Sequence, residues 1–308
     1  VINNDKILKS QPILENENHE IIKANIIILE SMIKLPSIKS IRTSMRTEFQ
    51  YLQTKQHFGN WGMGLIEANL NPTLIIGGIV NRFGSNAILG QGKIIVVEAD
   101  EFDRSFLSLK PTMSVINNLD LDHIDCYKNI NEVKDAFISF VNSFPFYGMA
   151  SICIDDQNVI DIQNKIKRPY KTFGLNKNAQ IRADKIYYSG FKSKFSLYVE
   201  NSFQDEIILS VPGKHNVQNS LAAISIALDL NISINFIKQG LKKYSGVKRR
   251  LEIKNSFDNG TILIDDYAHH PSEVKASLLA IKEAYNNRII TLFQPHLFSR
   301  TLNFYEDF

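Results

Sequence analysis

The chain has 308 residues, of which 44% are hydrophobic and 22% charged, so it has the composition of a folded protein with a buried core and a length that suits about two domains. Lys and Arg outnumber Asp and Glu by 35 − 32 = 3 and are spread along the sequence, which argues against a nucleic-acid or membrane surface. Two cysteines are too few for a disulfide framework, and no apolar run reaches the roughly 20 residues of a membrane span, so we predict a cytoplasmic protein.

The first segment, residues 1–65, gives the weakest structural signal. Its one helical pattern is IIKANIIILESMI, at residues 21–33. The stretch 37–63 has neither an alternating strand pattern nor a sustained apolar face. We therefore predict an aberrant N-terminal segment of uncertain structure before the first domain.

A parallel sheet is predicted from residue 73 onward, which indicates an α/β protein. Four β-rich runs form it: TLIIGGIV (73–80), KIIVVEAD (93–100), MSVINNLD (113–120) and MASICIDD (149–156). Between the third and fourth runs, INEVKDAFISFVNSF (130–144) repeats apolar residues at helical spacing, as expected of a crossover helix.

A small antiparallel sheet attached to the parallel one is predicted next. Three closely spaced strands indicate it: IYYSGF (186–191), KFSLYVE (194–200) and DEIILSV (205–211). Two amphipathic helices follow, at residues 217–230 and 234–244. We place the end of this central domain, residues 66–246, near Gly246.

A second α/β unit occupies residues 247–308. TILIDDYAHHP (261–271) reads as a strand running into a loop, KASLLAIKEAY (275–285) as a helix, and RIITLFQPH (288–296) as the next strand. One βαβ step is too small for a closed core, so we expect the truncated start of a further domain.

Acidic residues and one histidine follow two successive strands. The second run leads into four acids, Glu98, Asp100, Glu101 and Asp103, and the end of the third run leads to His123, which is flanked by Asp120, Asp122 and Asp125. Because ligands gather at the carboxyl ends of strands, and neighbouring strands lie about 5 Å apart, Glu98 and His123 could share a metal ion. The alternatives are a solvated helix start for the acids and a hydrogen-bonded turn for the histidine.

The segment VPGKHNVQN (211–219) leads into a predicted helix. Asn216 and Asn219 lie one turn apart, so both amides could face one planar group such as a nucleobase. The alternative is that Asn216 caps the helix N-terminus.

Two further polar segments lie near the domain junction. Lys248, Arg249 and Arg250 could bind phosphate or carboxylate, or could form interdomain salt bridges. Asp266, His269 and His270 lie on a loop after a strand, where a histidine pair is also compatible with an ordinary polar loop.

Taken in order, these segments resemble the Mur ligases of peptidoglycan synthesis. The resemblance covers residues 66 to 308 and is carried by NPTLIIGGIVNRFGSNAILG, VVEADEFDRSF, NNLDLDHIDCY, FPFYGMASICIDD, VPGKHNVQNSLAA, GVKRRLE, DDYAHHPSEV and FQPHLFSRT. It implies a UDP-binding N-terminal domain, a central P-loop-type ATPase domain and a Rossmann-like C-terminal domain. The closest members join L-alanine to UDP-N-acetylmuramate through an acyl phosphate; rivals are the members that attach a whole peptide in murein recycling, and a non-catalytic nucleotide-binding fragment.

The resemblance also implies roles for individual residues, with ATP and Mg²⁺ as cofactors. Glu98 and His123 would bind Mg²⁺, and their separation of 123 − 98 = 25 agrees with the family. Catalysis would involve Glu98, His123, Arg250, His270 and Arg300. ATP would contact His215, Asn216, Asn219 and Asp266. UDP-N-acetylmuramate and L-alanine would contact Asn86, Asn118, Arg249, Tyr267, His269 and His296.

One departure from the family concerns the phosphate-binding loop. Mur ligases carry a GTHGKTTT-type loop whose backbone N–H groups and lysine bind phosphate, but this chain contains no GK[ST]. At the corresponding place, residues 50–61 read QYLQTKQHFGNW. We hypothesise that residues 26–63 are read in a shifted frame, which reading the DNA in the other two frames would test. If the segment is genuine, we expect little or no ATP hydrolysis.

Overall fold

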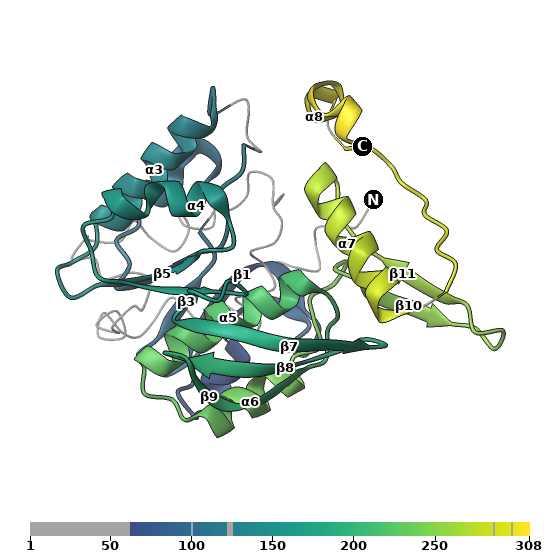
Figure 1. Ribbon diagram of the computed structural model, residues 1–308, viewed down its shortest axis with the longest axis horizontal. Helices are drawn as coiled ribbons and strands as arrows, with labels where there is room; N and C mark the ends of the chain where they lie inside the picture. The colour runs from purple at the N-terminus through teal and green to yellow at the C-terminus, as the bar shows by residue number, and fades with distance from the viewer. Residues whose placement is uncertain (1–61, 100, 122–125, 286, 297) are drawn as a thin grey trace, which may run out of the picture.

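The computed structural model describes residues 62–99, 101–121, 126–285, 287–296 and 298–308. The helix predicted at residues 21–33 and the position of the missing phosphate-binding loop lie outside these ranges. Figure 1 shows a middle unit built from two sheets with their helices, and a smaller C-terminal unit beside it. No helix among the described residues has both the length and the apolar character needed to cross a membrane.

The described part of the chain begins with helical residues 62–67, and a three-stranded sheet follows. It is formed by β1 (Thr73–Val80), β2 (Ser85–Ile88) and β3 (Ile95–Val97), in the order β2-β1-β3. The two predicted runs at 73–80 and 93–100 do pair in parallel as β1 and β3. The prediction of one sheet containing all four runs was wrong: β4 pairs with β5 in a separate sheet, and the antiparallel β2 takes the second edge of β1.

The larger sheet has six strands in the order β4-β5-β6-β7-β8-β9. β4 (Met113–Ile116), β5 (Met149–Cys153), β6 (Tyr170–Gly174) and β7 (Ile181–Ser189) pair in parallel. β7, β8 (Lys192–Val199) and β9 (Ser202–Leu209) then pair antiparallel. The three antiparallel strands are therefore confirmed, and they continue the parallel sheet directly through β7.

Helices cover these sheets as their apolar patterns require. α5 (Lys214–Asp229) is buried on nearly all sides, packs against β5, β6 and β7, and shares one core with residues of β1, β3 and α6 (Ile234–Lys243). A second core gathers around α3 (Ile130–Asn142), η3 (Phe102–Ser108) and α4 (Gln157–Ile162), followed by η4 (Gln163–Lys165). The predicted helices of the middle unit are thus confirmed.

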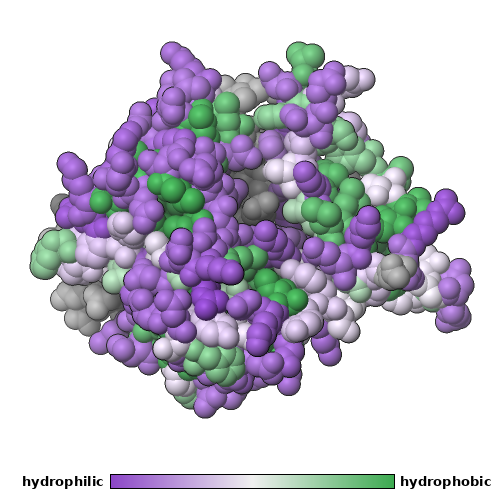
Figure 2. Space-filling view, viewed as in Figure 1, coloured by the Kyte–Doolittle hydropathy of each residue, from purple (hydrophilic) through white to green (hydrophobic). Residues whose placement is uncertain are grey.

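The C-terminal unit contains an antiparallel pair, β10 (Glu252–Ser256) and β11 (Ile262–Asp265), with α7 (Pro271–Ala284) beside it. α8 (Phe298–Asn303) and η5 (Tyr305–Asp307) follow. The predicted strand and helix at 261–271 and 275–285 correspond to β11 and α7. Figure 2 shows apolar side chains gathered over this unit, on the right of the view.

The strand predicted at residues 288–296 was wrong. The described chain there runs extended, away from β10 and β11, and forms no ladder (Figure 1). Ile290 and Leu292 are 82% and 101% exposed, so the apolar pattern that suggested a buried strand finds no surface to cover. A strand needs a neighbour for its backbone groups, and in this structure β11 pairs with β10 alone.

Backbone contacts join the two units. Asn81 N–H donates to Gly246 O at 3.1 Å and Lys248 N–H to Ile79 O at 2.9 Å, around an antiparallel bridge between Val80 and Val247. One residue further, Arg249 O accepts the Tyr267 N–H at 2.9 Å. The segment GVKRR therefore leaves the middle unit and enters the C-terminal unit within a few residues.

Candidate functional site

The loop between β11 and α7 is shaped by the way α7 begins. His270 is the N-cap residue, Pro271 follows at the first helical position, and the Glu273 side chain reaches back to the cap. Glu273 Oε2 accepts the backbone N–H groups of His269 at 2.9 Å and His270 at 3.1 Å. This capping box fixes both histidines relative to α7.

Asp266 organises the other side of the same loop. Its Oδ1 accepts the Ala268 N–H at 2.7 Å, and its Oδ2 accepts the Leu251 N–H at 2.9 Å and the Ser277 hydroxyl at 3.1 Å. The carboxylate thus ties the start of the loop to the residue that precedes β10 and to the second turn of α7.

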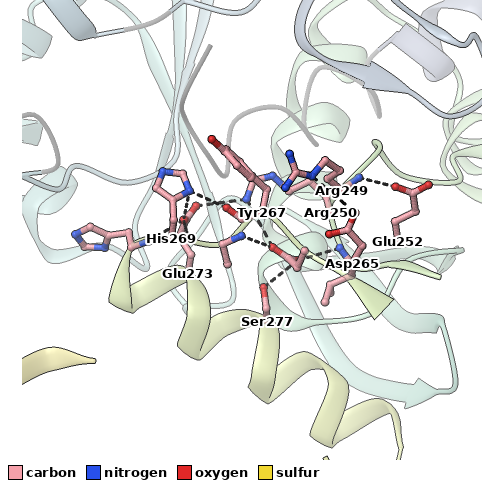
Figure 3. A network of polar contacts seen from close by, with 12 residues as sticks. Arg249, Arg250, Glu252, Asp265, Tyr267, His269, Glu273 and Ser277 are labelled. Carbon is pink, nitrogen blue, oxygen red and sulfur yellow. Dashed lines mark hydrogen bonds and ion pairs between the residues drawn. The ribbon is translucent and has the colours of Figure 1, made fainter. Parts of the chain in front are cut away.

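Arg250 lies between these two carboxylates. Its Nη1 is 3.5 Å from Glu273 Oε1 and 3.9 Å from Asp266 Oδ1, and its side chain is only 8% exposed. Figure 3 shows Arg250 and the loop side chains clustered beside the first turns of α7. Nη2 of Arg250 has no hydrogen-bond partner among the described residues. Nη1 is therefore held by the two carboxylates, whereas Nη2 is a buried donor that has no partner among those residues.

Aromatic rings from the loop and from His296 pack together in tilted and edge-to-face arrangements. The Arg249 guanidinium lies 4.5 Å from the Tyr267 ring centre, a cation–π distance. Tyr267 and His269 have ring centres 4.9 Å apart, and those of His269 and His296 are 5.5 Å apart. Four of the residues predicted for substrate binding are thus brought together.

The buried histidines are held neutral near neutral pH. Burial lowers the pKa of His269 to about 3, with the positive charges of Arg300 and Arg250 acting in the same direction. Burial also lowers the pKa of His270. His269 Nδ1 lies 2.7 Å from the Tyr267 carbonyl oxygen, which can only accept, so Nδ1 carries the proton and Nε2 is the acceptor nitrogen of the neutral ring.

Glu273 experiences opposing effects. Burial raises the pKa of this carboxyl group, while Arg250 and the two loop N–H groups lower it.

Arg300, on α8, is also buried. Its charge acts on both His269 and His270, which places the predicted anion-binding arginine near the same loop.

The N-terminus of α5 brings the middle unit to Arg250. Burial, assisted by the Arg250 charge, lowers the pKa of His215 to about 4. Gly213 has φ 97°, and a Cβ there would lie 2.7 Å from Ala280 Cβ and 2.9 Å from His215 Cε1. A glycine is therefore required where α7 approaches α5.

Asn216 and Asn219 are both buried on the first turns of α5. The alternative that Asn216 caps the helix is wrong, since Gly213 occupies the cap position. Asn216 Nδ2 instead donates to the Pro212 carbonyl at 2.6 Å, and its Oδ1 has no partner among the described residues. A buried acceptor without a partner carries a desolvation cost that a ligand donor would relieve.

Glu98 follows β3 and is fixed by the neighbouring strand. Its Oε2 accepts the Gly77 N–H at 2.5 Å, and its own N–H donates to Ile75 O at 2.9 Å. The buried Tyr244 lies within electrostatic range of both Glu98 and Arg250. A carboxylate oxygen is a ligand that Mg²⁺ prefers, and Glu98 fits that role.

The predicted pairing of Glu98 with His123 stays a prediction, since His123 lies outside the described residues, as do Asp100, Asp122 and Asp125. Over the described ranges, no three His, Cys, Asp or Glu side chains form a metal-binding group. Asn86 and Asn118 are both exposed, Asn86 on the outer edge strand β2 and Asn118 just after β4. Neither has a described contact with the loop before α7.

Sequence reasoning missed Glu273, Ser277 and Tyr244. Glu273 had a signal, because a Glu three residues after a cap is half of a capping box, but histidine is not a usual cap residue. Ser277 and Tyr244 sit within helical patterns that gave no reason to separate them from the surface or the core.

Comparison with known proteins identifies the class. The chain matches the Mur ligase middle domain over residues 80–227 and the Mur ligase glutamate ligase domain over residues 249–308. A family of unknown function also matches residues 5–81. A UDP-N-acetylmuramate–L-alanine ligase of a Geobacter species is 38% identical over 314 residues, covering 100% of this chain and 67% of that protein. The chain belongs to the Mur ligase family, which confirms the predicted family and fold class.

Other relatives carry the same name. The UDP-N-acetylmuramate–L-alanine ligase of Persephonella marina is 47% identical over 248 residues, covering 80% of this chain and 53% of that protein. The crystal structure of the UDP-N-acetylmuramate–alanine ligase of Thermotoga maritima matches with a TM-score of 0.68 and 25% identity, over 81% of this chain and 57% of that one. The chain spans about half the length of several curated relatives that it matches, 53% for two Geotalea species and for Pelobacter propionicus.

Proposed function

We propose that the chain carries the ATP-binding and amino-acid-binding parts of a cytoplasmic ligase that joins L-alanine to UDP-N-acetylmuramate. The observation that supports this most is the position of Arg250, between the carboxylates of Asp266 and Glu273 and within electrostatic range of His215 on α5. It brings the two matched domains to one anion-binding junction, as an ATP-dependent ligase requires. The names of the relatives supply the substrates.

Nucleotide binding is assigned to the start of α5. The buried Oδ1 of Asn216 is an acceptor suited to the exocyclic amine of adenine, and His215 and Asn219 lie on the same turns. Asp266 would act on the nucleotide side by keeping the loop before α7 in place. Glu98, together with His123, would hold Mg²⁺, which when bound neutralises phosphate charge.

Substrate handling is assigned to the loop and the arginines. A substrate carboxylate oxygen attacks the terminal phosphorus of ATP and ADP leaves; the alanine nitrogen then attacks the acyl carbon and phosphate leaves. Arg250 and Arg300 would stabilise the negative charge that spreads over the oxygens in both steps. His269, neutral with Nε2 as acceptor, would accept a hydrogen bond from an N–H of the amine, and His270 would orient the loop.

The remaining predicted residues would bind the two acceptor substrates. Arg249, Tyr267 and His296 pack beside His269 and would contact L-alanine and the muramyl carboxylate. Asn86 and Asn118, exposed and further away, would contact the nucleotide sugar.

Binding measurements on the chain test this proposal. We expect calorimetric titration to show binding of ATP and of adenosine, and expect phosphate release with UDP-N-acetylmuramate and L-alanine to stay near background, because the sequence has no GK[ST]. If the chain binds neither ATP nor adenosine, the assignment of nucleotide binding to the start of α5 is contradicted. In a variant carrying a GTHGKTTT-type loop at residues 50–61, L-alanine should drive phosphate release; a tripeptide driving it instead would favour the recycling activity.

A further inference from the structure

Arg250 forms ion pairs with two carboxylates that are themselves fixed by hydrogen bonds. Asp266 is fixed by three hydrogen bonds, two of them from backbone N–H groups, and Glu273 by two backbone N–H groups at the cap of α7. Neither carboxylate is free to follow the guanidinium, so the guanidinium takes the position that they define.

Glu273 is the closer and better buried of the two partners. Its Oε1 is 3.5 Å from Arg250 Nη1, against 3.9 Å for Asp266 Oδ1, and its side chain is 6% exposed. Its Oε2 accepts hydrogen bonds from the two loop N–H groups. Its Oε1 has no hydrogen-bond partner among the described residues and forms the ion pair with Arg250. One side chain therefore links the cap of α7 to Arg250.

We propose that Glu273 is a positioning residue that holds Nη1 of Arg250 so that Nη2 faces a phosphate oxygen of a bound nucleotide or nucleotide sugar. This rests on the function proposed above. Nη2 is buried and unpartnered among the described residues, and Arg250 lies toward His215 and Tyr244 of the middle unit, where the ligand would arrive.

Whether a substitution at Glu273 strengthens or weakens anion binding distinguishes a positioning role from a purely electrostatic one. Glu273→Gln keeps an oxygen for the loop N–H groups but removes one negative charge near Arg250. If Glu273 acted through charge alone, its removal would strengthen binding of an anion. If Glu273 positions Arg250, the loss of the ion pair would weaken anion binding despite the more positive site. Glu273→Asp keeps the charge but shortens the side chain, so it should weaken binding as well.

The experiment is calorimetric titration of ATP, adenosine and UDP-N-acetylmuramate into the full chain and its variants. Glu283→Gln is the matched control, because Glu283 is exposed on the same helix and the substitution changes net charge equally. We expect Glu273→Gln and Glu273→Asp to weaken binding of ATP, of UDP-N-acetylmuramate or of both by about tenfold, the usual worth of a charge-assisted hydrogen bond, with adenosine unchanged. The ligand whose binding is weakened is the one whose phosphate contacts Arg250.

A double-mutant cycle completes the test. In an Arg250→Lys background, adding Glu273→Gln should cost much less than it does alone, because the two residues act through one contact. Unchanged or tighter binding of both phosphate ligands by Glu273→Gln would overturn the positioning role while leaving the proposed function intact. A wild-type chain that binds none of the three ligands would overturn both. Circular dichroism on each variant confirms that the fold is retained.

Discussion

The adjacent residues Asp265 and Asp266 should differ sharply in their contribution to stability. Asp266→Ala removes three hydrogen bonds, from Leu251 N–H, Ala268 N–H and the Ser277 hydroxyl. At about 1 kcal/mol net for each bond, the free energy of unfolding should fall by about 3 kcal/mol. Among the described residues, Asp265 has two long ion pairs, 3.7 Å to Arg249 and 3.6 Å to Lys254. Exposed pairs of this kind contribute at most about 0.5 kcal/mol, so Asp265→Ala should be nearly neutral.

Urea denaturation followed by circular dichroism measures this difference. Both variants lose one carboxylate at neighbouring positions, so the change in net charge is the same and cancels in the comparison. Amide hydrogen exchange at Leu251 and Ala268 gives a local measurement, and should accelerate in Asp266→Ala alone. Equal losses of stability in the two variants, or unchanged exchange at both amides, would show that Asp266 does not organise this loop.

Two further predictions concern packing and pH. Gly240→Ala should lower the thermal midpoint by an amount equivalent to about 1–3 kcal/mol, because its Cβ would lie 2.7 Å from Gly64 Cα. Gly64→Ala should not, because its Cβ would meet no atom of the described residues within 4 Å. The urea midpoint should decrease as the pH is lowered from neutral to about 5. The pKa values of His215 and His269 in the folded chain are about 4 and 3, so over this range the unfolded chain takes up protons that the folded chain does not. The raised pKa of Glu273 offsets part of this fall, and His269→Asn should flatten it; a flat wild-type profile would contradict the burial argument.

The helices of the middle unit could be predicted because their apolar residues repeat at helical spacing. α3 and α5 both carry such patterns and lie where the sequence places them. β6 was not predicted, since YKTFG is short and its Lys171 and Thr172 break the apolar run. Strand order was also beyond the sequence, because pairing depends on which edges remain available in three dimensions.

The candidate site was only partly predictable, and for a similar reason. Arg250, Asp266, His269 and His270 stand out as polar clusters beside strands, and the structure brings them together. The sequence does not show which of the acidic residues holds the loop and which contacts Arg250. That Asp266 holds the loop while Glu273 reaches Arg250 follows from hydrogen-bond directions, which depend on where α7 begins.

The short turn from Val247 to Arg250 determines how the two units can move. The Lys248 amide is committed to the middle unit, whereas both backbone groups of Arg249 are committed to the C-terminal unit, through Glu252 and Tyr267. A rotation of one unit relative to the other would therefore change mainly the backbone torsion angles between Lys248 and Arg249. Such a rotation would carry the Arg250 guanidinium and its two carboxylates as a single rigid body. Opening the junction would withdraw this positive charge from α5 without breaking any of its ion pairs.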